Sequence, residues 1–226
     1  MNSCESAYSS VLKRIAAASR AAGRDDPASL VAVGKTKPPA ALRSLALLGQ
    51  RAFGENYVQE AVAKQKELED LELIWHAIGP LQSNKCRDVA RRFDWLQTLD
   101  RAKLIEPLAR HRPSDRAPLN VLIQVNIDDE ASKSGCAPEA VSGLAEQIRL
   151  QPALRLRGLM AIPAPRPDLE RRRVAFARMR ELFDALAARD PGIDTLSMGM
   201  SDDFELAIAE GATMVRIGTA LFGRRE

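Results

Sequence analysis

The sequence predicts an α/β protein: a single (β/α)8 barrel preceded by an N-terminal helix, which occupies residues 1–226 as one domain. Eight short apolar segments alternate with amphipathic helical segments, and this is the order expected of such a barrel. The composition does not shift along the chain, so no domain boundary is indicated. Polar residues stand at the carboxyl ends of most apolar segments, where barrels of this kind carry their active sites. A doubly wound open sheet is the alternative fold, but it usually contains fewer strands.

The chain opens with a helix over residues 3–22, which Gly23 ends as a C-terminal cap. The apolar face of this helix carries Tyr8, Val11, Leu12, Ile15 and Ala16. Apolar runs predict strands at 30–35, 52–56, 73–78, 95–98, 119–126, 156–161, 195–198 and 214–217. Apolar residues in helical register predict helices at 39–49, 57–70, 83–93, 101–110, 138–150, 168–189 and 202–210. Ser83 is a candidate N-cap, and the segment Pro163–Pro167 is expected to be a loop inside the domain.

Composition excludes several classes of function. The 33 basic and 30 acidic residues give a net charge of +3, which is too balanced for nucleic acid or an anionic membrane to be the main partner. The three cysteines are far apart and form neither a disulfide framework nor a zinc spacing. No apolar run reaches ~18 residues, and no signal peptide is visible. We therefore expect a cytoplasmic protein.

Lys35 is the first residue that the strand pattern does not explain. It ends the predicted strand 30–35 and shares a face with Val31 and Val33. The chain has only eight lysines against 25 arginines, so a lysine at this place is unusual. A desolvated lysine can lose its proton near neutral pH and form a Schiff base, which arginine cannot do. The alternative is a strand-end lysine whose ammonium group reaches water.

Other candidate ligand-binding residues stand at or near the ends of predicted strands. These are Asn56, His76, Gln124, Asn126, Met160 and Met198. Each has a plain structural alternative, since His76 is a common type of core residue and the methionines are common core filler. Their repetition on most strands favours a ligand at the mouth of the barrel.

The segments after the last two strands predict a phosphate site. Gly199–Ser201 leads into a helix, and Gly218 and Thr219 close the final strand. Barrels often bind phosphate between these two loops, because glycine lets the backbone approach an anion and hydroxyl groups donate to it. Capping and turn formation are the alternative roles. Asp202 and Asp203 would repel a phosphate, so we expect them to point outward.

Arg216 lies inside an apolar strand, on the face of Met214 and Gly218. A buried arginine needs a partner. The partner is either an internal carboxylate or an acceptor on a ligand.

Taken together, several motifs resemble one known family. They are Val31–Pro38, Phe53–Glu60, Trp75–Lys85, Gln124–Asn126, Lys133–Gly135, Arg157–Pro163, Leu196–Asp203 and Met214–Ala220. They span nearly the whole chain in order, and they resemble the pyridoxal phosphate homeostasis proteins, whose fold is that of the barrel domain of alanine racemase. Gly34 stands where the family commonly has Ser, and Ala77 where many members have Phe.

The resemblance implies a set of cofactor-binding residues. Lys35 would carry pyridoxal 5′-phosphate as an internal aldimine, and it is favoured over Lys37, which shares its strand parity but lies past the strand end beside Pro38. The remaining roles follow from the same resemblance: the phosphate would lie on Ser201, Gly218 and Thr219, the pyridine nitrogen on Arg216, and the ring against Asn56, His76 and Met198.

Three functions remain open at this stage. The first is a non-enzymatic protein that holds pyridoxal 5′-phosphate, buffers it and supplies it to PLP-dependent apo-enzymes. The second is a weak amino-acid racemase that uses Lys35 with His76 or Tyr57 as acid and base. The third is a lyase that forms a Schiff base between Lys35 and a phosphorylated carbonyl substrate. The first is favoured, because an arginine at the pyridine nitrogen disfavours an electron-sink mechanism and no second domain is expected after Glu226. For the same reason we expect a monomer.

Overall fold

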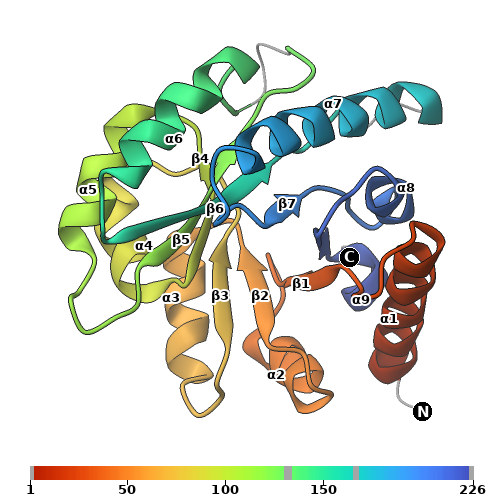
Figure 1. Ribbon diagram of the computed structural model, residues 1–226. Coiled ribbons are helices and arrows are strands. Elements are labelled where there is room, and N and C mark those ends of the chain that lie inside the picture. The colour runs from red at the N-terminus through yellow and green to blue at the C-terminus, as the bar shows by residue number, and fades with distance from the viewer. Residues whose placement is uncertain (1–2, 130–133, 165–167, 224–226) are drawn as a thin grey trace.

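The computed structural model describes residues 3–129, 134–164 and 168–223. Eight parallel strands form a closed barrel in the order β1 to β8 (Figure 1). The strands are β1 Ser29–Val33, β2 Ala52–Glu55, β3 Ile74–Ala77, β4 Trp95–Leu99, β5 Leu119–Gln124, β6 Leu154–Met160, β7 Thr195–Ser197 and β8 Met214–Ile217. The predicted (β/α)8 barrel is confirmed, and the doubly wound alternative is wrong.

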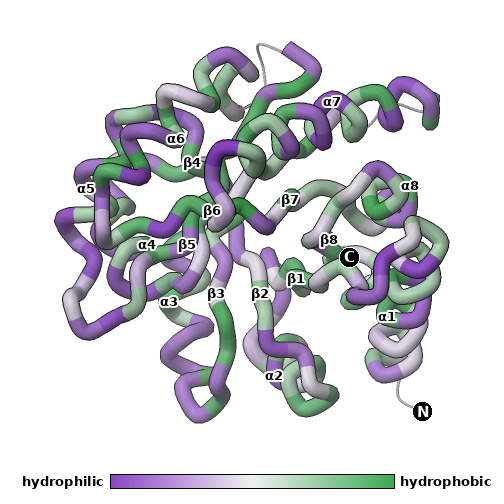
Figure 2. Tube along the Cα trace, viewed as in Figure 1, coloured by the Kyte–Doolittle hydropathy of each residue, from purple (hydrophilic) through white to green (hydrophobic). Residues whose placement is uncertain are grey.

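Helices follow the strands and cover the outside of the barrel (Figure 1). The α-helices are α1 Ser3–Ala21, α2 Pro39–Leu47, α3 Val58–Glu67, α4 Cys86–Arg92, α5 Ile105–His111, α6 Val141–Arg149, α7 Leu169–Ala187, α8 Phe204–Ala209 and α9 Thr219–Phe222. Short 3₁₀ turns are η1 Ser83–Lys85, η2 Ala102–Leu104 and η3 Pro138–Ala140. Figure 2 shows polar and apolar residues alternating along the helices, as expected when one face of each packs on the sheet.

The leading helix α1 packs beside α8 and α9 (Figure 1). Its buried face carries Tyr8, Val11 and Ile15 as predicted, but Leu12 is 40% exposed and does not belong to that face. Gly23 has a φ of +71°, and the adjacent Arg24 N–H donates to the carbonyl of Ser19, which confirms the predicted glycine cap.

Several element boundaries differ from those predicted, mostly on the carboxyl side of the strands. β1 ends at Val33, so Lys35 lies in a turn and not in a strand. Ser83 is the first residue of η1 and Gln82 precedes it as the cap, so the predicted N-cap is wrong. The short helix α9 was not predicted. Within the predicted proline-rich loop, residues 165–167 lie outside the described residues.

The pairing of β1 with β8 closes the barrel and brings an early segment of the chain next to a late one. Ser29 pairs with Met214, and the register continues to Ala32 opposite Ile217. The turn that carries Lys35 therefore lies next to the loop that follows β8.

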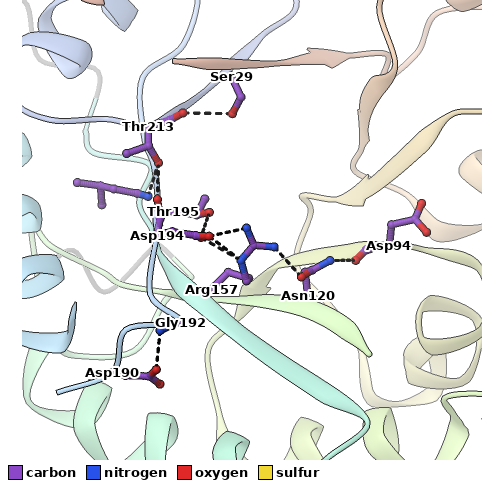
Figure 3. Close-up of polar contacts among 10 residues, drawn as sticks. Ser29, Asp94, Asn120, Arg157, Asp190, Gly192, Asp194, Thr195 and Thr213 are labelled. Atoms are coloured by element: carbon purple, nitrogen blue, oxygen red, sulfur yellow. Dashed lines mark hydrogen bonds and ion pairs between the residues drawn. The ribbon is translucent and has the colours of Figure 1, made fainter. Parts of the chain in front are cut away.

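The amino ends of the strands are joined by a polar network (Figure 3). Arg157 makes a bidentate contact with Asp194 and also donates to Asn120, whose side chain donates to the backbone carbonyl of Asp94. Burial raises the pKa of the Asp194 carboxyl, but hydrogen bonds from Arg157 and Thr195 outweigh this effect and lower its pKa. This end of the barrel is occupied by structural contacts, which leaves the opposite end for a ligand.

A search of the described residues finds no helix that is both long and apolar enough to span a membrane.

Candidate functional site

A pocket of about 400 Å³ opens at the carboxyl ends of the strands. Its walls come from the segments that follow β1, β2, β3, β6, β7 and β8. They are formed by Val33, Lys35, Thr36, Lys37, Asn56, Ile78, Gly79, Pro80, Ile162, Met200, Ser201, Asp202, Arg216, Gly218, Thr219 and Gly223. Six of the eight residues predicted as cofactor-binding lie together here: Lys35, Asn56, Ser201, Arg216, Gly218 and Thr219.

Two lysines are among the described residues that line the pocket, and only the amine of Lys37 has a hydrogen-bond partner in the described part of the chain. Lys37 Nζ donates to the backbone carbonyl of Phe222 at 3.1 Å. Lys35 is half-buried and makes no hydrogen bond or ion pair with any residue that the structure describes. An amine in a concave site without a protein partner is available to a ligand, which favours Lys35 over Lys37 as the attachment point.

Arg216 is almost fully buried, with 3% of its surface exposed. Its guanidinium donates to Ser197 Oγ at 2.6 Å and to the carbonyl of Ala161 at 2.8 Å. Burial lowers the pKa of this group to about 10, against an opposing influence of Asp203. Among the described residues no carboxylate forms a direct ion pair with Arg216, although Asp203 acts on it electrostatically. A buried cation with neutral partners and a face on a pocket favours an acceptor on a bound molecule.

The loops after β7 and β8 are joined directly. Ser201 Oγ accepts a hydrogen bond from the backbone N–H of Ala220 at 3.3 Å. Asp203 is absent from the pocket wall; its carboxylate accepts from Met200 N–H at 2.8 Å and lies 3.6 Å from Arg172. Asp202, however, lines the pocket, so the expectation that it points outward is wrong.

Asn56 is held in place by the close approach of Gly79. A Cβ atom added to Gly79 would lie 2.2 Å from the backbone oxygen of Asn56. The Ile78 N–H donates to the carbonyl of Glu55 at 3.0 Å, and Thr98 Oγ1 donates to the carbonyl of Gly79 at 2.7 Å. The absence of a side chain at residue 79 therefore lets the segment after β3 support the segment that carries Asn56.

His76 does not line the pocket, although the resemblance placed it against the cofactor ring. It is 2% exposed inside the barrel, where its ring stacks on Trp95 with centroids 5.3 Å apart. Its Nδ1 atom lies 3.0 Å from Gln97 Nε2. Burial lowers the pKa of His76 to about 3, so the ring is neutral. Ile78 is the next residue on the same strand face and stands between His76 and the mouth.

Met198 is also absent from the pocket wall. It is fully buried and belongs to the hydrophobic core outside the barrel strands. The preceding residue, Ser197, points into the barrel toward Gln97 and Arg216, so strand parity turns Met198 the other way. Met200, two residues further along, is 37% exposed and lines the pocket.

Sequence reasoning also missed Thr36, Ile162 and Gly223 as pocket residues. Thr36 and Ile162 stand within three residues of a strand end, a position that could have marked them. Gly223 carried no such signal, because the helix before it was not predicted.

Comparison with known proteins places this chain in a family. A model of the alanine racemase N-terminal domain matches residues 8–226. The pyridoxal phosphate homeostasis protein of Pseudomonas aeruginosa is 57% identical over 218 residues, which cover 96% of this chain and 93% of that protein. The protein of the same name from Escherichia coli is 50% identical over 230 aligned positions, covering 100% and 98%.

Solved structures give the same result. PipY of Synechococcus elongatus, in a structure with PLP bound, is 38% identical with a TM-score of 0.81, covering 93% of this chain and 99% of that one. Alanine racemase from Corynebacterium glutamicum is 22% identical with a TM-score of 0.65, covering 95% and 62%, and shares the fold.

The fold and the extent of the family match define the class first: the chain is a barrel of the alanine racemase type. Within this class, the chain belongs to the family of the pyridoxal phosphate homeostasis proteins.

Proposed function

We propose that this protein binds pyridoxal 5′-phosphate on Lys35 and serves in intracellular PLP homeostasis, holding the cofactor and releasing it without turning over a substrate. The observation that carries the proposal is the pairing, in one pocket, of a lysine amine and a buried arginine, for which the described residues provide no hydrogen-bond partner to the amine and no direct ion pair to the arginine. The relatives named as homeostasis proteins and the PLP-bound PipY structure support it.

The pocket residues fit the chemistry of this cofactor. When bound, pyridoxal 5′-phosphate supplies an aldehyde that condenses reversibly with a primary amine. Lys35 provides that amine, and the linked loops with Ser201, Gly218 and Thr219 provide hydroxyl and backbone donors for the phosphate. Arg216 is assigned to the ring nitrogen and Asn56 to the ring surroundings. A donor-only arginine leaves a ring nitrogen unprotonated.

The composition of the pocket wall supports storage over catalysis. Among the wall residues that the structure describes, the side chains that can carry charge are Lys35, Lys37, Asp202 and Arg216. The imidazole named for the racemase alternative, His76, lies beneath this wall and is neutral. Tyr57 is 64% exposed and lines a separate depression that shares Asn56 and Pro80 with the pocket. No observation on the described residues favours the racemase or the lyase.

The wider role follows from reversible attachment. A cofactor held through a condensation that water or another amine can reverse can be stored and passed on. We propose PLP-dependent apo-enzymes as recipients, a cytoplasmic location, and a monomer formed by one domain.

Borohydride trapping tests the attachment residue. The wild-type protein incubated with pyridoxal 5′-phosphate should show a visible absorbance band, and reduction should add the mass of one cofactor to the peptide that contains Lys35. Lys35→Ala should lose this modification, because among the described wall residues the only other amine, that of Lys37, is hydrogen-bonded to the carbonyl of Phe222. Lys37→Ala is the matched control and should keep it. A colourless wild-type protein of unchanged mass after reduction would overturn the proposal.

A further inference from the structure

The turn that presents Lys35 has an unfavourable backbone conformation. Thr36 has a φ of +64°, a value that L residues seldom adopt and that is least favourable for a β-branched side chain. The Lys37 N–H donates to the carbonyl of Gly34 at 2.9 Å and closes the turn. A strained turn persists only where its surroundings hold it.

Those surroundings are a charged cluster formed by the buried Lys64 and Glu55 and the partly exposed Glu60. Lys64 Nζ donates to Glu60 Oε1 at 2.6 Å and to Glu55 Oε1 at 2.8 Å. Its third hydrogen bond goes to the backbone carbonyl of Gly34 at 2.8 Å. An ammonium group has three donors, and all three are used here.

The cluster holds the turn from both sides of Lys35. On one side, Lys64 holds the carbonyl of Gly34. On the other, Glu60 Oε1 accepts from the backbone N–H of Thr36 at 2.9 Å. Lys64 and Glu60 are one turn apart on α3, so a single helix fixes both flanks of the residue that carries the amine.

The position of Gly34 is matched to this cluster. A Cβ atom at residue 34 would lie 2.6 Å from Glu55 Oε1 and 3.0 Å from a methyl group of Leu42. Lys64 is 4% exposed and Glu55 is 2% exposed, so the cluster is part of the interior and not of the pocket wall. No function assigned to the pocket uses it.

We propose that Lys64 and Glu60 are positioning residues that set the conformation of the Gly34–Lys37 turn and thereby direct the Lys35 amine into the pocket, with Glu55 anchoring Lys64 beneath it. The inference rests on the proposed function only in taking Lys35 as the attachment residue.

Amide exchange in the protein without cofactor tests the positioning directly. In Lys64→Met, the Thr36 amide should exchange at least about tenfold faster than in the wild type, because the turn loses its hold on Gly34. The matched control is Lys66→Met, since Lys66 lies on the same helix but is exposed. It should leave the exchange rate unchanged. Equal protection of Thr36 in Lys64→Met and Lys66→Met would overturn the inference.

A second pair of variants covers the case in which Lys64→Met does not fold. Glu60 has 30% of its side chain exposed, so its removal leaves less buried charge unpaired. Glu60→Ala should raise the exchange rate of the Thr36 amide. It should also weaken cofactor binding by roughly tenfold, measured by titration of the visible absorbance band. Glu60→Gln keeps an acceptor oxygen and should restore both. Failure of Glu60→Gln to restore them would refute the role of the Thr36 hydrogen bond.

The two proposals fail in different ways. A wild-type protein that takes up no pyridoxal 5′-phosphate refutes the proposed function, while the exchange data still decide the role of Lys64. A wild-type protein that binds the cofactor, with Lys64→Met and Glu60→Ala binding it equally well, refutes the inference alone.

Discussion

Four buried polar side chains form a chain across the interior of the barrel, directly beneath the pocket. Arg216 donates to Ser197, Ser197 donates to Gln97, and Gln97 lies beside His76. Each of the four side chains comes from a different strand. Together these hydrogen bonds fix the guanidinium of Arg216 through neutral partners. His76 is thus a supporting residue of the site although it does not reach the pocket.

The buried neutral state of His76 makes stability depend on pH. Burial depresses the pKa of His76 from 6.5 to about 3, so its contribution to stability is fully present above about pH 6.5 and is lost as the pH falls toward 3. The free energy of unfolding should fall by up to about 1.4 kcal/mol per pH unit in this window. In His76→Asn, which keeps an acceptor near Nδ1, this dependence should be absent.

The contribution of Glu55 to the pH dependence of the unfolding free energy must be separated from that of His76. Burial raises the pKa of Glu55 from 4.5 to about 7, so its contribution has the opposite sign and is lost as the pH rises through this range. The difference between His76→Asn and wild type in urea unfolding, taken from pH 4 to 7, isolates the histidine. His111→Asn, at the end of α5, serves as control and should retain the wild-type slope. A slope retained in His76→Asn would contradict the assignment.

At the scale of single residues, sequence predicted the site where a side chain breaks the pattern of its strand. Lys35 and Arg216 stood out as cations on apolar faces, and both line the pocket. His76 and Met198 do not line the pocket, because strand periodicity gives neither the depth of a residue along the barrel axis nor the side of the sheet that it faces. The contacts of Ser197 settle that facing, and they come from strands distant in sequence.

At the scale of elements, the segments just beyond the strands build the pocket. The predicted strands ran too far at these ends, to Lys35, Asn56 and Met198. Local apolar pattern continues past the point where the backbone leaves the sheet. The alternation of strands and helices was predictable because it depends on local periodicity. The residue at which each strand ends was not, because it depends on contacts between neighbouring loops.

A substitution at Gly79 tests the segment that follows β3. Gly79→Ala should destabilise the fold by about 1–3 kcal/mol and weaken cofactor binding, because its Cβ would displace the backbone of Asn56. Gly143→Ala is the control: residue 143 lies in α6, is exposed and has nothing within 4 Å of an added Cβ, so it should gain about 0.5–1 kcal/mol. Chemical denaturation and absorbance titration measure both effects. Unchanged binding in Gly79→Ala would show that Asn56 does not need this support.

At the scale of the whole molecule, the barrel separates stability from binding. The amino end carries the Arg157 network of Figure 3. The Arg157 guanidinium also lies 4.8 Å from the centroid of the Trp95 ring. The carboxyl end carries the pocket. The two ends share strands but no polar side chain among those named for each.

Arg157→Met tests this separation. It should lower the free energy of unfolding by about 1–2 kcal/mol, since Asn120 and Asp194 lose their donor, while the affinity for pyridoxal 5′-phosphate stays at the wild-type value. Arg43→Met removes an exposed ion pair with Asp70 and should leave stability nearly unchanged. A large loss of affinity in Arg157→Met would show that the two ends are coupled.

The neighbouring position of β1 and β8 has a consequence for how the protein matures. The pocket takes residues 33–37 from early in the chain and residues 200–223 from its last part. A ribosome-bound chain that has not yet emitted β8 possesses the Lys35 amine but lacks the arginine and the hydroxyl loops beside it. Cofactor binding therefore requires that β8 has paired with β1 and closed the barrel. The time at which the visible absorbance band appears during refolding would measure when this closure occurs.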